Sequence, residues 1–126
     1  MNRIPLIDRA HTSPDRKALL DQIHGAFGAT PNMFRAVAKS PAALQSMWAA
    51  FDALGSGTLS AKLGEQIAVA VANRNACEYC LAAHTALGRK AGATADEMAA
   101  AQVGQAGDAA TQAALNFALK VVEQRA

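Results

Sequence analysis

Apolar residues recur at helical spacing along most of this chain, and no segment shows the strict apolar-polar alternation of a half-buried strand. Near the N-terminus the pattern predicts a short amphipathic helix that begins at Pro14, after the cap residue Ser13, and ends at Gly28. A second short helix is predicted to begin at Pro31. The hydrophobic pattern therefore predicts an all-α fold.

A third predicted helix follows the cap residue Ser40 and ends at a glycine-rich turn that begins with Gly55, after which Ser60 is expected to cap the next helix. Its large apolar residues lie at helical spacing: Leu44, Met47, Trp48, Phe51 and Leu54. A stripe of this kind is far more often core than a cofactor-binding surface, so we expect it to be buried.

Two helices joined by a break at residues 73–75 are predicted around the two cysteines. Asn75 and Glu78 have the spacing of a capping box, so we expect Asn75 to be the N-cap of the second helix. Cys77 and Cys80 then lie in the first turns of that helix. There the exposed N–H groups and the positive end of the helix dipole favour a thiolate over a thiol.

Helical spacing also predicts which side chains of these two helices meet. Cys80 and His84 are four residues apart, so they share one face of the second helix, and Cys77 lies one turn before Cys80. At ~1.5 Å rise per residue, Glu65 before the break and His84 after it both lie about 14–15 Å from the turn. If the helices pack antiparallel, the Glu65 carboxylate reaches the His84 imidazole, which reaches the Cys80 sulfur directly or through one water. We expect a proton relay to a nucleophile.

Capping signals also predict two helices near the C-terminus. Thr94 and Glu97 have the spacing of a capping box, and Asp108 is expected to cap the last helix. That helix is predicted to pack through Ala114, Leu115, Ala118, Leu119 and Val122.

Composition limits the class of protein. The 126 residues, 52% of them hydrophobic, fit one domain over residues 1–126, with residues 1–13 as an extended arm. The net charge of +2 comes without a basic run, so neither nucleic acid nor a membrane surface is an expected partner. No apolar stretch reaches the ~18 residues of a membrane span, and the N-terminus shows no apolar leader, so we expect a cytoplasmic protein.

Alanine is unusually abundant, which bears on assembly. Small side chains let helices approach closely, but each buries little apolar area at ~25 cal/mol per Å². A lone subunit of this size would be marginally stable, and we therefore expect a homo-oligomer.

The separations of Glu65, Cys77, Cys80 and His84 resemble the E-x11-C-x2-C-x3-H signature of the AhpD-like alkylhydroperoxidases, within the carboxymuconolactone decarboxylase superfamily. The resemblance is strong over residues 65–92 and extends over a core of residues 41–117. It implies an all-α helical bundle that assembles into trimers or hexamers. It also implies reduction of a hydroperoxide by the cysteine pair, without cofactor or metal, with a dithiol or lipoyl-type electron donor.

The same resemblance implies a role for each site residue. Cys80 would attack the peroxide, Cys77 would resolve the product to a disulfide, and Glu65 and His84 would supply the relay. The best-studied branch of the family has a histidine between the cysteines, where this chain has Tyr79. A phenol passes a proton through a hydrogen bond but is no base at neutral pH, so Tyr79 is expected either to join the relay or to pack.

Three alternatives use the same residues. A thiol–disulfide oxidoreductase without peroxide activity needs only the CxxC pair. A zinc site would take Cys77, Cys80 and His84 as ligands, with a fourth from Glu65 or His24. A non-catalytic helical assembly would leave the thiols unreactive.

Other classes fit the sequence less well. The c-type haem attachment is excluded, because Leu81 rather than histidine follows Cys80. The decarboxylase branch of the superfamily does not use a CxxC. His11 and His24 have no register with the cysteines, so we expect both to be structural.

Overall fold

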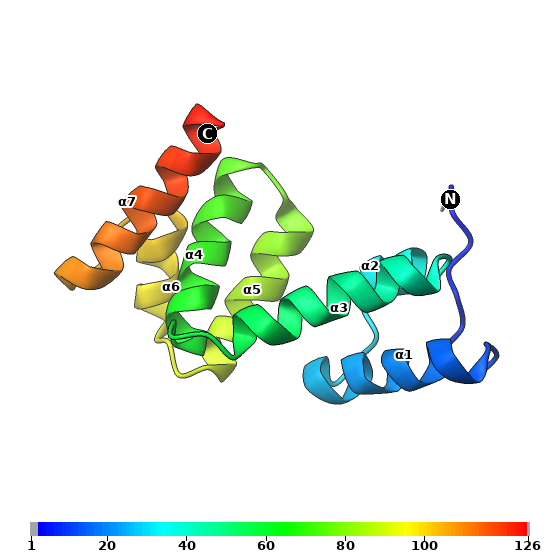
Figure 1. Ribbon diagram of the computed structural model, residues 1–126. Coiled ribbons are helices and arrows are strands. Elements are labelled where there is room, and N and C mark those ends of the chain that lie inside the picture. Colours follow the sequence, from blue (N-terminus) through cyan, green and yellow to red (C-terminus); the bar gives the residue numbers. More distant parts are fainter. Residues whose placement is uncertain (1–2, 126) are drawn as a thin grey trace. The chain divides into compact units, whose positions relative to one another are not determined.

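The computed structural model describes residues 3–125, which form seven helices and contain no strand (Figure 1). The helices are α1 (Pro14–Phe27), α2 (Asn32–Val37), α3 (Pro41–Gly55), α4 (Ala61–Arg74), α5 (Glu78–Lys90), α6 (Ala95–Gln102) and α7 (Ala109–Gln124). The predicted all-α fold is confirmed. No helix among the described residues is long and apolar enough to cross a membrane.

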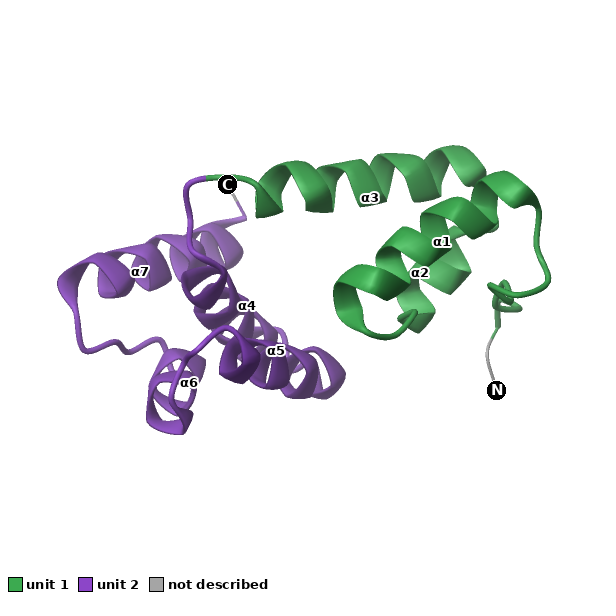
Figure 2. Cartoon of the chain, turned by 90° about the horizontal axis from the view of Figure 1, so that it is seen from below, with its two compact units in different colours: residues 1–57 green, residues 58–126 purple. Residues whose placement is uncertain are grey.

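The chain divides into two compact units, Met1–Gly57 and Thr58–Ala126, coloured separately in Figure 2. Each unit has a hydrophobic core of its own. The single domain expected over residues 1–126 stays a prediction. The first two residues of the expected N-terminal arm lie outside the described residues.

Unit 1 contains α1, α2 and α3, and its helix ends follow the sequence signals. Pro14 is the first residue of α1, and Gly28 ends that helix in the left-handed conformation, at φ 73°. Residues 3–13 form no helix, and Ile7 is joined to Arg35 of α2 by two hydrogen bonds. The buried core of the unit consists of Leu20, Ile23, Phe34, Ala38 and Leu44.

The predicted apolar stripe of α3 is buried only in its first half. Leu44 is fully buried and Trp48 is half-buried, but Phe51 is 43% exposed and Leu54 is 80% exposed. The expectation of a fully buried stripe is therefore wrong within unit 1. The reason is geometric, because the core formed with α1 and α2 covers only the first half of α3.

Unit 2 is built around α4, which packs against α5, α6 and α7 (Figure 1). The predicted caps are confirmed: Ser60 caps α4, Asp108 caps α7, and Thr94 with Glu97 forms a capping box at the start of α6. The core of the unit consists of Val69, Ala70, Ala93, Met98, Ala101 and Leu115. Capped helix ends and a shared core hold α4 and α5 side by side, and the two helices carry the candidate site.

Candidate redox site

The turn between α4 and α5 differs from its prediction. Asn75 does not begin α5. It ends α4, which extends through Arg74, and the N-cap of α5 is Cys77. Ala76 between them adopts a left-handed conformation at φ 51°. The prediction is wrong because the chain reverses within three residues, which leaves no room for Asn75 to cap the second helix. Glu78 accordingly becomes the first residue of α5 rather than a capping-box partner.

Cys77 and Cys80 form a disulfide at the N-terminus of α5, as the CxxC spacing suggests. Their Cα atoms are 5.3 Å apart. The Cys77 sulfur also accepts a hydrogen bond from the backbone N–H of Cys80, with an N···S distance of 3.3 Å. A cysteine at the N-cap therefore replaces the usual hydroxyl or carboxylate cap, and a sulfur of the disulfide lies against the positive end of the helix dipole.

Glu65 of α4 and His84 of α5 lie level with each other, as predicted from their distances to the turn. The Nδ1 of His84 is 2.8 Å from Oε2 of Glu65. The side chain of Glu65 is 23% exposed and that of His84 is 36% exposed, so the pair is partly screened from water. A carboxylate only accepts, so Nδ1 carries the proton in this hydrogen bond. The other ring nitrogen, Nε2, then lies on the side of the ring that faces away from Glu65.

The disulfide and the imidazole line one pocket of about 230 Å³. Its other lining residues come mainly from the facing side of α4, and the full lining consists of Ala68, Val71, Ala72, Asn75, Cys77, Cys80 and His84. Within residues 3–125, His84 forms no hydrogen bond to either sulfur in this disulfide state. A small apolar pocket thus contains both sulfurs and the only imidazole of unit 2.

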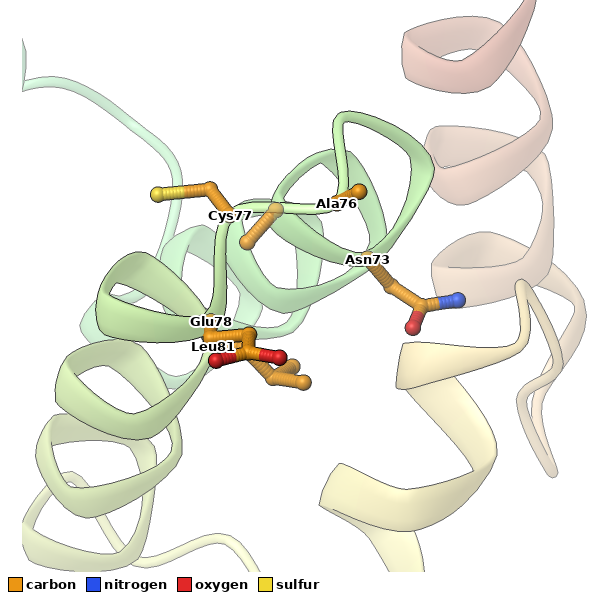
Figure 3. A pocket seen from close by; sticks show the side chains of 6 residues that line it. Asn73, Ala76, Cys77, Glu78 and Leu81 are labelled. Carbon is orange, nitrogen blue, oxygen red and sulfur yellow. The ribbon is translucent and has the colours of Figure 1, made fainter.

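A second hollow of about 240 Å³ lies on another side of the turn and is drawn in Figure 3. Asn73, Glu78 and Leu81 line it, and the Cys77 sulfur points away from these three side chains. Cys77 lines both hollows, and it is bonded to Cys80, which lines the pocket that contains His84.

Tyr79, which was expected either to join the relay or to pack, lies largely in solvent. Its side chain is 71% exposed and forms no hydrogen bond among the described residues. The geometry therefore does not bring Tyr79 together with Glu65 and His84. The two remaining histidines lie in unit 1, where His24 bonds to Thr30 and His11 to Asp8.

The zinc alternative finds no support in the arrangement of side chains. Within residues 3–125, no group of three or more His, Cys, Asp and Glu side chains is placed to hold a metal ion. The two sulfurs that would be its main ligands are bonded to each other. A metal would have to bind a reduced and rearranged form of this site.

Gly88 also lies at the site, although no sequence motif pointed to it. It is buried on α5, one helical turn after His84. A Cβ at this position would lie 3.3 Å from the Cβ of Glu65. The available signal was a lone glycine inside a helical pattern, which often marks a close approach between elements.

Comparison with known proteins agrees with this geometry. The family model described as "Carboxymuconolactone decarboxylase family" matches residues 38–124, and the chain belongs to this family. Within the superfamily the chain is AhpD-like, as the sequence predicted. A similar solved structure is the alkylhydroperoxidase AhpD core from Rhodospirillum rubrum. It is 29% identical with a TM-score of 0.71, over 100% of this chain and 93% of that chain. Comparison with curated proteins found no match.

Proposed function

We propose that this protein is a thiol-dependent peroxidase that reduces organic hydroperoxides with the Cys77–Cys80 pair. The observation that carries the proposal is the Glu65–His84 hydrogen bond of 2.8 Å, because the imidazole lines the same pocket as both sulfurs. A base held by a carboxylate beside a redox cysteine is the arrangement that peroxide chemistry needs. The similarity to an alkylhydroperoxidase core supports the same class of reaction.

The reaction begins with a thiolate. In the reduced protein, Nε2 of His84 takes the proton of Cys80, and Glu65 stabilises the imidazolium through Nδ1–H. The Cys80 thiolate attacks the distal oxygen of the hydroperoxide and breaks the O–O bond. Cys80 becomes a sulfenic acid, and the alkoxide leaves as an alcohol with the proton that His84 returns.

The second half of the cycle restores the thiols. The Cys77 thiol attacks the Cys80 sulfenic acid, an S–S bond forms, and one water leaves. The product is the disulfide seen here. An external dithiol, such as a lipoyl-type donor, then reduces this disulfide and becomes oxidised itself. Two electrons pass from the dithiol to the peroxide in each cycle, and no cofactor or metal is needed.

The test is peroxide consumption by purified protein with a dithiol reductant. Cys80→Ser is expected to abolish turnover, and Glu65→Gln to lower kcat by about a hundredfold, since general acid–base catalysis contributes at least that much. Glu78→Gln is the matched control, because Glu78 lies beside the cysteines but outside the relay. Equal loss in both glutamine variants would contradict the relay.

A second candidate function is thiol–disulfide exchange without peroxide activity. The disulfide at a helix N-terminus supports it, because that position stabilises a leaving thiolate. A wild-type protein that consumes no hydroperoxide, yet reduces disulfide substrates with a dithiol, would favour this candidate. The decarboxylase chemistry for which the family is named has no specific observation in its favour at this site.

We also propose that the protein assembles into a homo-oligomer. Phe117 and Val121 lie one turn apart on α7 and are 72% and 40% exposed, respectively, and Val103 is 63% exposed. Such apolar surface is what association between subunits would bury. Sedimentation velocity tests this proposal, and a monomer at micromolar concentration would overturn it.

A further inference from the structure

We propose that Gly88 is a positioning residue for the proton relay, because its missing side chain sets the separation of α4 and α5 where Glu65 reaches His84. This inference rests on the proposed function. Gly88 lies four residues after His84, so both are on the face of α5 that packs against α4. It is buried, and its conformation is not one that only glycine adopts.

The space around Gly88 is too small for a side chain unless its neighbours move. A Cβ built there would lie 2.5 Å from both Cε and Sδ of Met98 and 3.3 Å from the Cβ of Glu65. The end of the Met98 side chain is flexible and can rotate away. The Cβ of Glu65 cannot, since it is fixed to the backbone of α4. An added methyl group would therefore push the two helices apart at this level.

Glu65 connects the close approach at Gly88 with the hydrogen bond to His84. Its Cβ lies at the level of Gly88, while its carboxylate reaches His84, one turn away along the groove between the helices. The side chain is thus fixed at its base by the close helix approach and at its tip by the hydrogen bond. A shift of α4 by a few tenths of an ångström at the base lengthens the 2.8 Å hydrogen bond at the tip.

Replacing a glycine inside a helix by alanine normally stabilises the helix. The loss expected for Gly88→Ala therefore comes from its close neighbours, and Gly64, which has none, provides the comparison. Gly64 directly precedes Glu65 on α4, and no neighbouring heavy atom lies within 4 Å of the place its Cβ would take. Alanine at residue 64 should raise helix propensity without moving the relay. Gly64→Ala is therefore the matched control for Gly88→Ala.

The test combines turnover with a direct probe of the hydrogen bond. In Gly88→Ala we expect kcat for hydroperoxide to fall by about tenfold, since small misplacements of catalytic groups have effects of this order. In a Glu65→Gln background the same change should have little further effect, because the relay is already lost. Gly64→Ala should retain wild-type kcat. Equal losses with and without Glu65 would overturn the proposal.

A readout without turnover separates this inference from the proposed function. The Nδ1–H proton of His84, bonded to a carboxylate, should give a downfield proton NMR signal in the wild type and in Gly64→Ala. It should weaken or move upfield in Gly88→Ala, even if no peroxide is consumed. An unchanged signal would overturn the positioning role. If Gly88→Ala does not fold, Gly88→Ala with Met98→Ala removes the closest clash and keeps the Glu65 contact, and the same outcomes apply.

Discussion

The sulfur of Cys77 accepts a hydrogen bond from the backbone N–H of Cys80 at 3.3 Å, so the first cysteine of the CxxC is also the N-cap of α5. The helix start and the redox pair are therefore one structural feature. A thiolate at Cys77 would accept a hydrogen bond from the same N–H group and would be stabilised by the positive end of the helix dipole. The N-cap of α5 is thus Cys77, two residues after Asn75, the N-cap predicted from the sequence.

The cap suggests how to separate the proposed redox role of Cys77 from its structural role. Serine is a good N-cap, so Cys77→Ser should retain the fold and lose only the resolving thiol. We expect one equivalent of peroxide to be consumed per subunit, with Cys80 left as a sulfenic acid that a dimedone-type probe labels. Mass spectrometry measures the adduct. Normal cycling of Cys77→Ser with a dithiol donor would show that the roles are wrongly assigned.

The exposure of Tyr79 predicts that its hydroxyl is dispensable. Tyr79→Phe removes only this group, which forms no hydrogen bond within residues 3–125. We expect kcat and its pH profile to match those of the wild type, whereas His84→Gln should lower kcat by about a hundredfold. A comparable loss in Tyr79→Phe would show that the phenol joins the relay in the working enzyme.

The left-handed conformation of Ala76 predicts a position sensitive to branched side chains. At φ 51°, valine is disfavoured far more than in a helix, so Ala76→Val should lower the free energy of unfolding by about 1–2 kcal/mol. Ala82→Val, at an exposed position inside α5, should cost only about 0.5 kcal/mol. Urea denaturation of the two oxidised variants measures the difference. Equal costs would mean that the turn relaxes around the new side chain.

The capping box of α6 predicts a loss of stability in acid. The Lys62 ammonium, 2.6 Å from Glu97, and the backbone N–H of Thr94 lower the pKa of Glu97 from its ordinary value of 4.5. A carboxyl group whose pKa is lower in the folded state contributes stability that is present above pH 4.5 and is lost as the pH falls through the folded pKa. Because the group is near the surface, we expect a modest effect.

The variant Glu97→Gln tests this pH dependence. Its thermal midpoint should fall less than that of the wild type between pH 5 and pH 3, because it has no carboxyl group to protonate at this position. Asp96→Asn is the control, since the side chain of Asp96 is exposed in the same first turn and forms no ion pair within residues 3–125. Identical acid sensitivity in Glu97→Gln and the wild type would contradict the assignment.

Local interactions explain what the sequence predicted correctly. The caps Ser60, Thr94 and Asp108 were predictable because a cap bonds to backbone within three residues. The helical repeat alone places Cys80 and His84, four residues apart, on one face of α5. The level pairing of Glu65 with His84 needed one further assumption, that the helices pack antiparallel, and the structure bears this out.

Tertiary structure decided the remaining features. The conformation of Ala76 moved the start of α5, since a reversal within three residues constrains the backbone more than cap propensity does. The exposure of Leu54 depends on how far the unit 1 core extends along α3, and helical periodicity contains no information on that length. The close approach at Gly88 likewise depends on the distance between helices, which side chains from three helices fix together. The sequence by itself thus determined the helices, the caps other than that of α5, and the pairing of Glu65 with His84 on which the proposed relay depends. Packing between helices decided burial and the spacing of the relay, because these depend on residues far apart in the chain.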